Sequence, residues 1–303
     1  MMELRILGCH SATPKPGEFP SAQALMAGNQ WLLLDAGEGM QMQLRRYKVK
    51  FGRIKHIFIT HLHGDHLYGL FGLLSTLRLL DRRTELHLHG PPPLERLLDE
   101  VFRASQVELT YPLHFHPVTA DRPRQILDEK HFTVHSVPLR HRLPTTGYVI
   151  REKPKPRKLN PEAIARYPEI GIWAYHKLKA GEDFVRDDGT RIPNAELTLP
   201  PPPPRQYAYI SDTAYSPGIV PHIQGSDVLY HEATFADADA ALAEKTFHST
   251  ARQAAMIARD AGVGKLIIGH FSSRYPDPRV LLDEARAVFP NTELAFEGKI
   301  LSF

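Results

Sequence analysis

The chain has 303 residues, 42% hydrophobic and 23% charged, an ordinary composition for a globular protein with ample material for a core. No apolar run approaches the roughly 18 residues of a membrane span, and the N-terminus enters a strand pattern directly, which argues against a membrane protein or a secretory signal. The single cysteine, Cys9, excludes an intramolecular disulfide. We therefore expect a cytoplasmic protein with no membrane partner.

The net charge of +3 is concentrated in one segment. Residues 151–206 contain 11 Lys and Arg against 8 Asp and Glu, whereas the rest of the chain is balanced. The same segment holds 10 of the 26 prolines, including five in succession from Pro200 to Pro204. Such a basic, proline-punctuated stretch predicts an arm inserted into the domain. Trp173 and Tyr175, followed by Lys177 and Lys179, favour phosphate binding with aromatic support over a merely solvated linker.

At the start of the chain, two strands are expected, Leu4–Leu7 and Trp31–Asp35, separated by a Pro/Gly-rich loop from Cys9 to Ser21. Asp35 ends the second strand immediately before a glycine turn. One interpretation is that its carboxylate caps a helix beginning near Met40. A second interpretation, which rests on a family resemblance, is that the carboxylate supports metal ligands from nearby segments.

Four potential metal ligands follow the next strand, Ile54–Ile59: His61, His63, Asp65 and His66. A helical pattern continues from them to about Leu80, so the four ligands occupy a tight strand-to-helix connection. His61 and His63 are two apart in an extended segment, so their side chains point the same way. Asp65 and His66 follow where the chain turns and can face a second metal position. This donor set suits zinc or another borderline divalent ion, and it is too dense for a chance histidine-rich loop.

Further strands and helices alternate along the rest of the chain. The patterns predict strands over Glu85–His89, His131–Val137, Gln206–Thr213, Asp227–Tyr230, Lys265–Gly269 and Thr292–Phe303, and helices over Leu94–Phe102, Pro161–Tyr167, Ala251–Ala261 and Arg279–Val288. Six histidines in the first half lack the ligand spacing and are interpreted as strand or surface residues: His87, His89, His114, His116, His131 and His135.

The pattern from His61 to His66 resembles the signature of the metallo-β-lactamase superfamily. The resemblance implies an α/β fold, a four-layer αββα sandwich with a binuclear metal site at one edge of its sheets. It also implies that His141 completes the first metal site and that Asp212 bridges the two metals. Asp35 would then support the ligands from behind, which leaves two open interpretations for this residue.

Four features are similar to the ribonuclease Z family: His231–Phe235, the helix start at His248–Thr250, Gly269–Tyr275, and the basic insertion. The resemblance spans residues 1–303 as one domain, with residues 151–206 as an exosite arm for tRNA. It implies an endoribonuclease that removes the 3′ trailer from precursor tRNA by a metal-bridging hydroxide, leaving a 3′-hydroxyl and a 5′-phosphate. It further implies a homodimer without a nucleotide cofactor. Two departures are Ser211, where the family has glycine, and the lack of a Gly-Pro pair near Gly171.

The resemblance also assigns roles at the site. One Zn²⁺ would be held by His61, His63 and His141, the other by Asp65, His66 and His270, with Asp212 shared and Mn²⁺ or another divalent ion possible in place of zinc. Asp65 would also orient the nucleophile. His248, paired with Glu232, would protonate the departing 3′-oxygen. Without these roles, His248 is a neighbour of a helix cap and Glu232 a buried structural acid.

Seven basic residues are candidates for RNA binding: Lys153, Lys155, Arg157, Lys158, Lys177, Lys179 and Arg274. Arg274 has an alternative role as an ion-pair partner. Two other functions share the predicted scaffold, a small-molecule phosphodiesterase or arylsulfatase and a non-catalytic RNA-binding protein. The basic arm argues against the first, and the complete ligand set argues against the second. A glyoxalase II is disfavoured because no separate C-terminal helical region is evident.

Overall fold

The computed structural model describes residues 2–303, which form two compact units. One unit comprises the chain up to Arg151 together with Arg205–Phe303, and the other is Glu152–Pro204. Within the described residues, no helix is both long and apolar enough to cross a bilayer.

The larger unit contains two seven-stranded sheets. In spatial order, the first is β18 (Ile300–Ser302), β1 (Glu3–Gly8), β2 (Ala22–Ala27), β3 (Gln30–Leu34), β4 (Ile54–Phe58), β5 (Leu86–Gly90) and β6 (Leu113–Pro117). The second is β17 (Thr292–Leu294), β16 (Lys265–Gly269), β15 (Val228–Glu232), β14 (Gln206–Ile210), β9 (Thr145–Glu152), β8 (Phe132–Leu139) and β7 (Arg124–Asp128).

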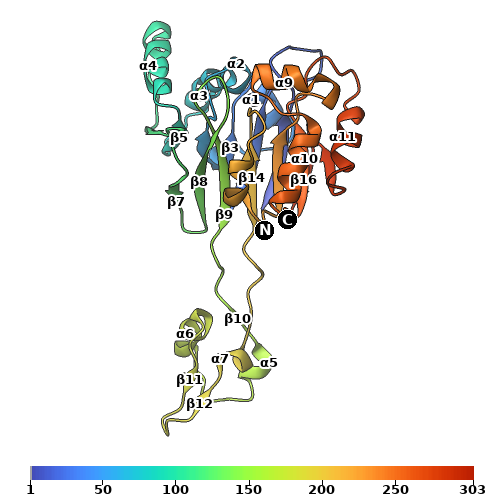
Figure 1. Ribbon diagram of the computed structural model, residues 1–303. Coiled ribbons are helices and arrows are strands. Elements are labelled where there is room, and N and C mark those ends of the chain that lie inside the picture. The colour runs from blue at the N-terminus through green and yellow to red at the C-terminus, as the bar shows by residue number, and fades with distance from the viewer. Residues whose placement is uncertain (1) are drawn as a thin grey trace. The chain divides into compact units, whose positions relative to one another are not determined.

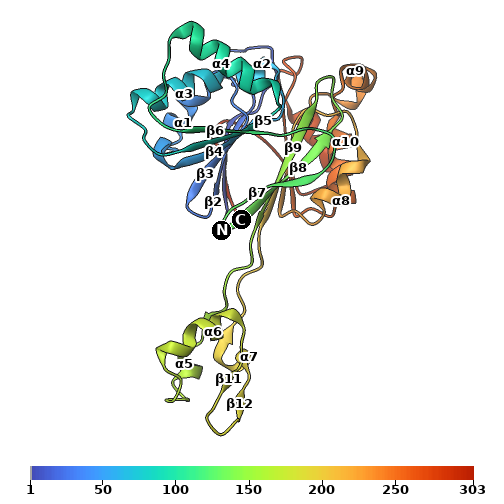
Figure 2. The same cartoon turned by 90° about the vertical axis from the view of Figure 1, so that its left-hand side faces the viewer.

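Helices cover the outer face of each sheet (Figure 2). Over the first sheet lie α1 (Met40–Arg46), α3 (Gly69–Leu79) and α4 (Pro93–Ser105). The short α2 (Gly64–Leu67) comes directly before α3 in the chain. Beside the second sheet lie α8 (Val220–Ile223), α9 (Ala240–Thr246) and α10 (Ala251–Asp260), with α11 (Arg279–Arg286) packed against α10 and β17 (Figures 1 and 2). The predicted four-layer αββα sandwich is thereby confirmed.

Strand periodicity divides the buried residues between layers. Leu32 and Leu34 of β3 belong to the core that includes the inner faces of both sheets, whereas Leu33 belongs to the core under α1 and α3. Alternate side chains of a strand point to opposite faces, so a strand covered on both sides is apolar throughout. This explains the uninterrupted Trp31–Leu34 sequence and the equally apolar Tyr207–Ile210 in β14.

One strand prediction was wrong, and four strands of the larger unit were missed: β2, β6, β7 and β9. The expected final strand, Thr292–Phe303, is two strands: β17 pairs with β16 in the second sheet and β18 with β1 in the first. The turn between them contains Gly298 with φ at +89°, a conformation that favours glycine. Among the missed strands, β2 has an Ala-rich sequence of low strand propensity and follows a loop rich in Pro and Gly.

The ends of the strands place the site. Strands β3 and β4 are parallel neighbours, as are β14, β15 and β16. Carboxyl ends of parallel strands meet at one edge, and here that edge carries α2 and α9 (Figure 1). Every predicted metal ligand follows a strand that ends there.

The smaller unit, Glu152–Pro204, has its own small core. Its elements are β10 (Lys158–Leu159), α5 (Pro161–Ile164), α6 (Tyr175–Ala180), β11 (Phe184–Val185), β12 (Arg191–Ile192), α7 (Asn194–Leu197) and β13 (Thr198–Leu199). The buried Asn194 amide donates to the carbonyls of Leu178 and Glu182 at 2.8 and 2.7 Å and so ties α7 to the end of α6. Ile172 and Trp173 remain 82% and 65% exposed.

Candidate metal centre and catalytic site

The ligand loop after β4 is held in place by close backbone approaches. A Cβ atom on Gly37 would lie 2.6 Å from the carbonyl oxygen of Asp65, so only glycine permits this turn to pass the loop. Glycine at Gly64, where α2 begins, avoids overlap with the ring of Tyr68. The loop therefore turns sharply enough to point its side chains at two neighbouring positions.

The first group of donors consists of His61, His63, His141 and Asp212. Nε2 of His61 lies 2.9 Å from Nδ1 of His63, which is 3.3 Å from Nε2 of His141. Nitrogens bound to one zinc ion at about 2.1 Å are roughly 3.4 Å apart in a tetrahedron, so these separations suit a shared ion. Oδ2 of Asp212 lies 3.6 Å from Nε2 of His61 and completes the group.

The second group contains Asp65, His66 and His270. Nε2 of His270 lies 3.3 Å from Oδ2 of Asp65, and Nε2 of His66 lies 3.4 Å from the same oxygen. Oδ1 of Asp212 approaches these two imidazole nitrogens at 3.4 and 3.3 Å. Asp212 therefore presents one carboxylate oxygen to each group, the arrangement expected of a bridging ligand.

Four of the five histidines in these groups have a hydrogen-bond acceptor at the ring nitrogen that faces away from the site. The acceptors are Oγ1 of Thr60 for His61 (2.9 Å), Oδ2 of Asp35 for His66 (2.8 Å), the carbonyl of Phe247 for His141 (2.9 Å) and Oγ1 of Thr234 for His270 (2.8 Å). Such outer partners fix the ring orientation and tautomer of a metal-ligating histidine.

Charge and burial favour a divalent cation at this site. Nε2 of His66 is buried and lies 3.3 Å from Oδ1 of Asp212 and 3.4 Å from Oδ2 of Asp65 without a well-directed hydrogen bond to either, as expected of a nitrogen that faces a metal position. Burial would lower the pKa of His66, but Asp212, Asp65 and Asp35 raise it well above its usual value. The three carboxylates thus stabilise positive charge at this point. His61, whose pKa is lowered first by burial and then by His66, is in the neutral form that binds metal.

A second cluster adjoins the ligands. Nδ1 of His248 lies 2.8 Å from Oε1 of the buried Glu232, whose other oxygen accepts a hydrogen bond from the Thr234 hydroxyl at 2.6 Å. Burial alone would lower the pKa of His248, but Glu232 raises it to about 9. His248 is therefore protonated at neutral pH and can donate a proton. The same hydroxyl of Thr234 contacts Nδ1 of His270 and links the two clusters.

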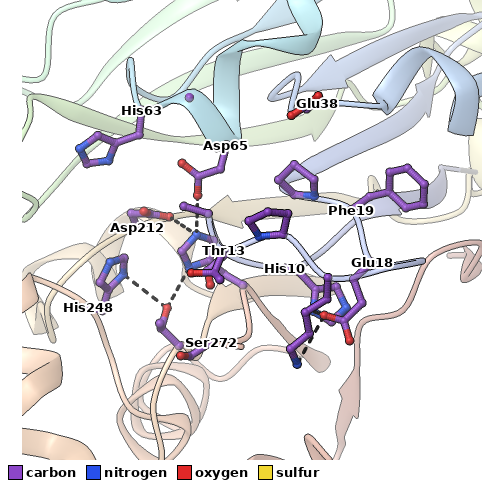
Figure 3. A pocket seen from close by; sticks show the side chains of 18 of the residues that line it. His10, Thr13, Glu18, Phe19, Glu38, His63, Asp65, Asp212, His248 and Ser272 are labelled. Carbon is purple, nitrogen blue, oxygen red and sulfur yellow. Dashed lines mark hydrogen bonds and ion pairs between the residues drawn. The ribbon is translucent and has the colours of Figure 1, made fainter. Parts of the chain in front are cut away.

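These side chains line a cavity of about 660 Å³. Figure 3 shows His63 and Asp65 on one side of it and His248 on the other, with Asp212 between them. The loop after β1 forms a further wall through residues that include His10, Thr13, Glu18 and Phe19. The cavity is thus open to a substrate at the metal ligands and at His248 together.

The predicted RNA-binding residues are distributed over both units. Arg274 is half exposed and lies 3.8 Å from Asp239, in agreement with the alternative of an ion pair. Lys155 pairs with Glu152 at 3.2 Å, and Arg157 donates to the Thr198 hydroxyl at 2.6 Å. Lys158, Lys177 and Lys179 are exposed, and Lys153 is partly exposed.

The structure adds residues that the sequence left without a role. Thr60 and Thr234 each orient a predicted ligand, and Arg142 lines the cavity next to His63. For the two threonines a signal existed, because each lies within a motif that also carries a ligand or an acid. Asp35 does not cap α1, which begins after Gly39 without a side-chain cap, so the capping interpretation was wrong.

Residues 2–150 match the family model described as anti-Pycsar protein Apyc1. Ribonuclease Z of Bacteroides fragilis is 45% identical over 300 residues, covering 99% of this chain and 98% of that protein. Ribonuclease Z of Porphyromonas gingivalis is 47% identical over 294 residues, with 97% and 96% covered. The crystal structure of the short form of human tRNase Z superposes with a TM-score of 0.72 at 26% identity, covering 99% and 98% of the two chains.

The Apyc1 match ends in β9, before Asp212, Glu232, His248 and His270, so it describes the first half of the site only. The ribonuclease Z relatives align with nearly the whole chain, including these four residues and the insertion. The donor groups agree with the divalent metal use of that family. The chain therefore belongs to the ribonuclease Z family of hydrolytic endoribonucleases, on the metallo-β-lactamase fold.

Proposed function

We propose that this protein cleaves the 3′ trailer from precursor tRNA, leaving a 3′-hydroxyl on the tRNA and a 5′-phosphate on the trailer. The observation that carries the proposal is the convergence of the two donor groups and the His248–Glu232 pair on one open cavity. The near-complete alignment with proteins named ribonuclease Z also supports the proposal.

The metal complement that we propose is two Zn²⁺ per chain, with Mn²⁺ or another divalent ion as a substitute. His61, His63 and His141 would hold one ion, and Asp65, His66 and His270 the other, with Asp212 common to both. Bound divalent ions would supply Lewis-acid activation of water and of the phosphoryl group. Asp65 stays ionised, because His66 and His270 outweigh the effect of burial and hold the pKa of its carboxyl well below the usual range. It can therefore orient the attacking water.

His248 is the proposed general acid. Its Nδ1 is committed to Glu232, which leaves Nε2 to donate a proton to the departing 3′-oxygen. Glu232 is fixed in turn by the backbone N–H of Thr213 and by Thr234, at 2.9 and 3.1 Å. A buried carboxylate held by several donors keeps the imidazolium charged and correctly oriented.

The smaller unit, Glu152–Pro204, is the proposed tRNA-binding arm. Lys177 and Lys179 are exposed on α6, directly after the exposed Ile172 and Trp173. Cations beside an apolar or aromatic surface suit a folded RNA, which proteins contact mainly through its backbone and unstacked bases. Lys153, Lys155, Arg157, Lys158 and, on the larger unit, Arg274 stay predictions for the same role.

A homodimer is also proposed. Helices α1 and α3 pack side by side, with a 2.7 Å hydrogen bond from Thr76 to Gln41. Four large apolar side chains on or next to these helices are between 51% and 76% exposed: Met42, Tyr68, Leu79 and Leu80. Exposed apolar side chains of this size fit association with a second copy of the chain. Cytoplasmic residence stays a prediction that the RNA substrate and the single cysteine favour.

Two substrates and one deletion test the proposal. The wild-type chain and a variant lacking residues 153–203 are assayed on a precursor tRNA and on bis(p-nitrophenyl) phosphate, a small phosphodiester. We expect the deletion to abolish cleavage of the precursor and to spare hydrolysis of the small ester, with circular dichroism confirming the fold. Hydrolysis of the small ester alone by the wild-type chain would instead indicate a small-molecule phosphodiesterase.

A further inference from the structure

One ligand histidine differs from the other four at its outward-facing nitrogen. Where the others meet a hydroxyl, carboxylate or carbonyl oxygen, Nε2 of His63 lies 3.4 Å from Nη2 of Arg142. A guanidinium is a donor only and accepts no hydrogen bond. His63 is thus the one ligand histidine among residues 2–303 whose remote nitrogen faces a cation in place of an acceptor.

The tautomer of His63 follows from its other nitrogen. Nδ1 lies within 2.9 Å of Nε2 of His61 and 3.3 Å of Nε2 of His141, so it is the atom that faces the donor group. When Nδ1 binds metal it carries no proton, and Nε2 carries the remaining N–H. Two N–H donors, one from His63 and one from Arg142, then face each other without an acceptor between them.

Arg142 also lacks an acidic partner. Within residues 2–303 no carboxylate lies within ion-pair distance of its guanidinium, although it lines the cavity and is exposed. Lys15, a second cation lining the same cavity, pairs with Glu18 at 3.6 Å. An unpaired guanidinium on a substrate cavity suits a phosphate, which it binds through two parallel hydrogen bonds.

We propose that Arg142 and the Nε2–H of His63 together bind a non-bridging phosphate oxygen of the RNA substrate. Nε2 lies across the imidazole ring from the metal-facing Nδ1, so this phosphate is a neighbour of the one being cleaved. The assignment rests on the proposed function, because it requires a substrate with more than one phosphate. Arg142 is then a binding and positioning residue, and it holds the strand in register with the metal centre.

Steady-state cleavage of precursor tRNA by R142A, R142K and R140A tests this assignment. Arg140 is the matched control, because it flanks His141 on the other side and is also exposed but is not among the residues that line the cavity. We expect R142A to raise KM roughly tenfold with a much smaller change in kcat, and R142K to be intermediate. In R142A the slope of log KM against log salt concentration should fall by about 1, the change expected when one phosphate contact is lost. R140A should stay within about twofold of wild type.

Metal content and a small substrate supply the other readouts. R142A should retain the metal content of the wild type by mass spectrometry, and it should lose less on bis(p-nitrophenyl) phosphate than on tRNA. An equal loss on both substrates, a loss of metal, or a KM and salt slope matching those of R140A would overturn the assignment. Failure of the wild-type chain to cleave precursor tRNA would overturn the proposed function and this assignment with it. Cleavage that is insensitive to Arg142 would overturn the assignment alone.

Discussion

Oδ2 of Asp35, at the end of β3, lies 2.8 Å from Nδ1 of His66, a predicted metal ligand in the next loop. The same carboxylate accepts hydrogen bonds from the backbone N–H of Thr60 at 2.8 Å and from the hydroxyl of Tyr209 at 2.8 Å. Asp35 thereby connects the ligand loop of the first sheet to β14 of the second. It reaches these groups from the left-handed region, with φ at 59°.

Replacing Asp35 by asparagine should weaken metal binding by about 10- to 100-fold, because the ring of His66 loses its anionic partner. Asparagine tolerates the left-handed backbone, so the loss reports the carboxylate and not backbone strain. Equilibrium dialysis with Zn²⁺ measures the effect. Y209F, which removes one hydrogen bond to the same oxygen and leaves the contact with His66, is the control and should lose less. Equal affinities in D35N and wild type would contradict a supporting role.

The two donor groups should lose metal differently. We expect about two ions per wild-type chain, about one in H141A, and fewer than one in D212A, since Asp212 faces both groups. Elemental analysis after exhaustive dialysis gives these values. Two retained ions in D212A would show that its carboxylate is not a shared ligand.

Replacing His248 by alanine should lower kcat for precursor tRNA by about 10²- to 10⁴-fold while metal content is kept. The loss should be much smaller on bis(p-nitrophenyl) phosphate, whose leaving group needs no proton. E232Q should show the same pattern, and the double variant should be little worse than either single one, because the two residues act as one pair. A loss on the small ester as large as that on RNA would exclude the general-acid role.

A row of histidines crosses the first sheet away from the metal centre. Nδ1 of His56 lies 3.1 Å from Nε2 of His89, and Nδ1 of His87 lies 3.0 Å from Nε2 of His116. Burial, and then the neighbouring His87, lowers the pKa of His56 to about 4. Burial, and then His56, lowers the pKa of His89 to about 2. The folded protein therefore holds these two imidazoles neutral.

The row should make stability depend on pH. In the unfolded chain each histidine has a pKa of about 6.5, so the unfolded state binds more protons below that pH. The contribution of His56 to the free energy of unfolding is therefore largest above about pH 6.5. It decreases as the pH falls towards 4, by about 3 kcal/mol in all. Urea unfolding between pH 7.5 and 4 measures this. The double variant H56F/H89F should show a shallower dependence, and an unchanged dependence would contradict the account.

The sequence alone predicted that the donors from His61 to His66 lie close together, because four donors within six residues after a strand can only converge locally. His141, Asp212 and His270 came from family resemblance, since each is unremarkable in its own segment. The role of Asp35 could not be decided, because it depends on the distance between the end of β3 and the loop after β4. That distance is a property of strand pairing and not of local sequence.

Other differences between the expectations and the structure also arise from the arrangement of distant segments. Arg140 and Arg142 flank the same histidine, and nothing in the sequence shows which one lines the cavity. The division of the last predicted strand between two sheets depends on the turn at Gly298, which an apolar pattern does not reveal. Low-propensity β2 forms because β1 and β3 provide hydrogen-bond partners on both sides.

Mapping the cut in an end-labelled precursor tRNA at single-nucleotide resolution, with D65A in parallel, tests the proposed tRNA 3′-processing activity most directly. We expect one cut, immediately after the discriminator base, with a 3′-hydroxyl on the tRNA and a 5′-phosphate on the trailer, and no cut by D65A. Cleavage at scattered positions, a 3′-phosphate on the tRNA, or equal activity of D65A would contradict it.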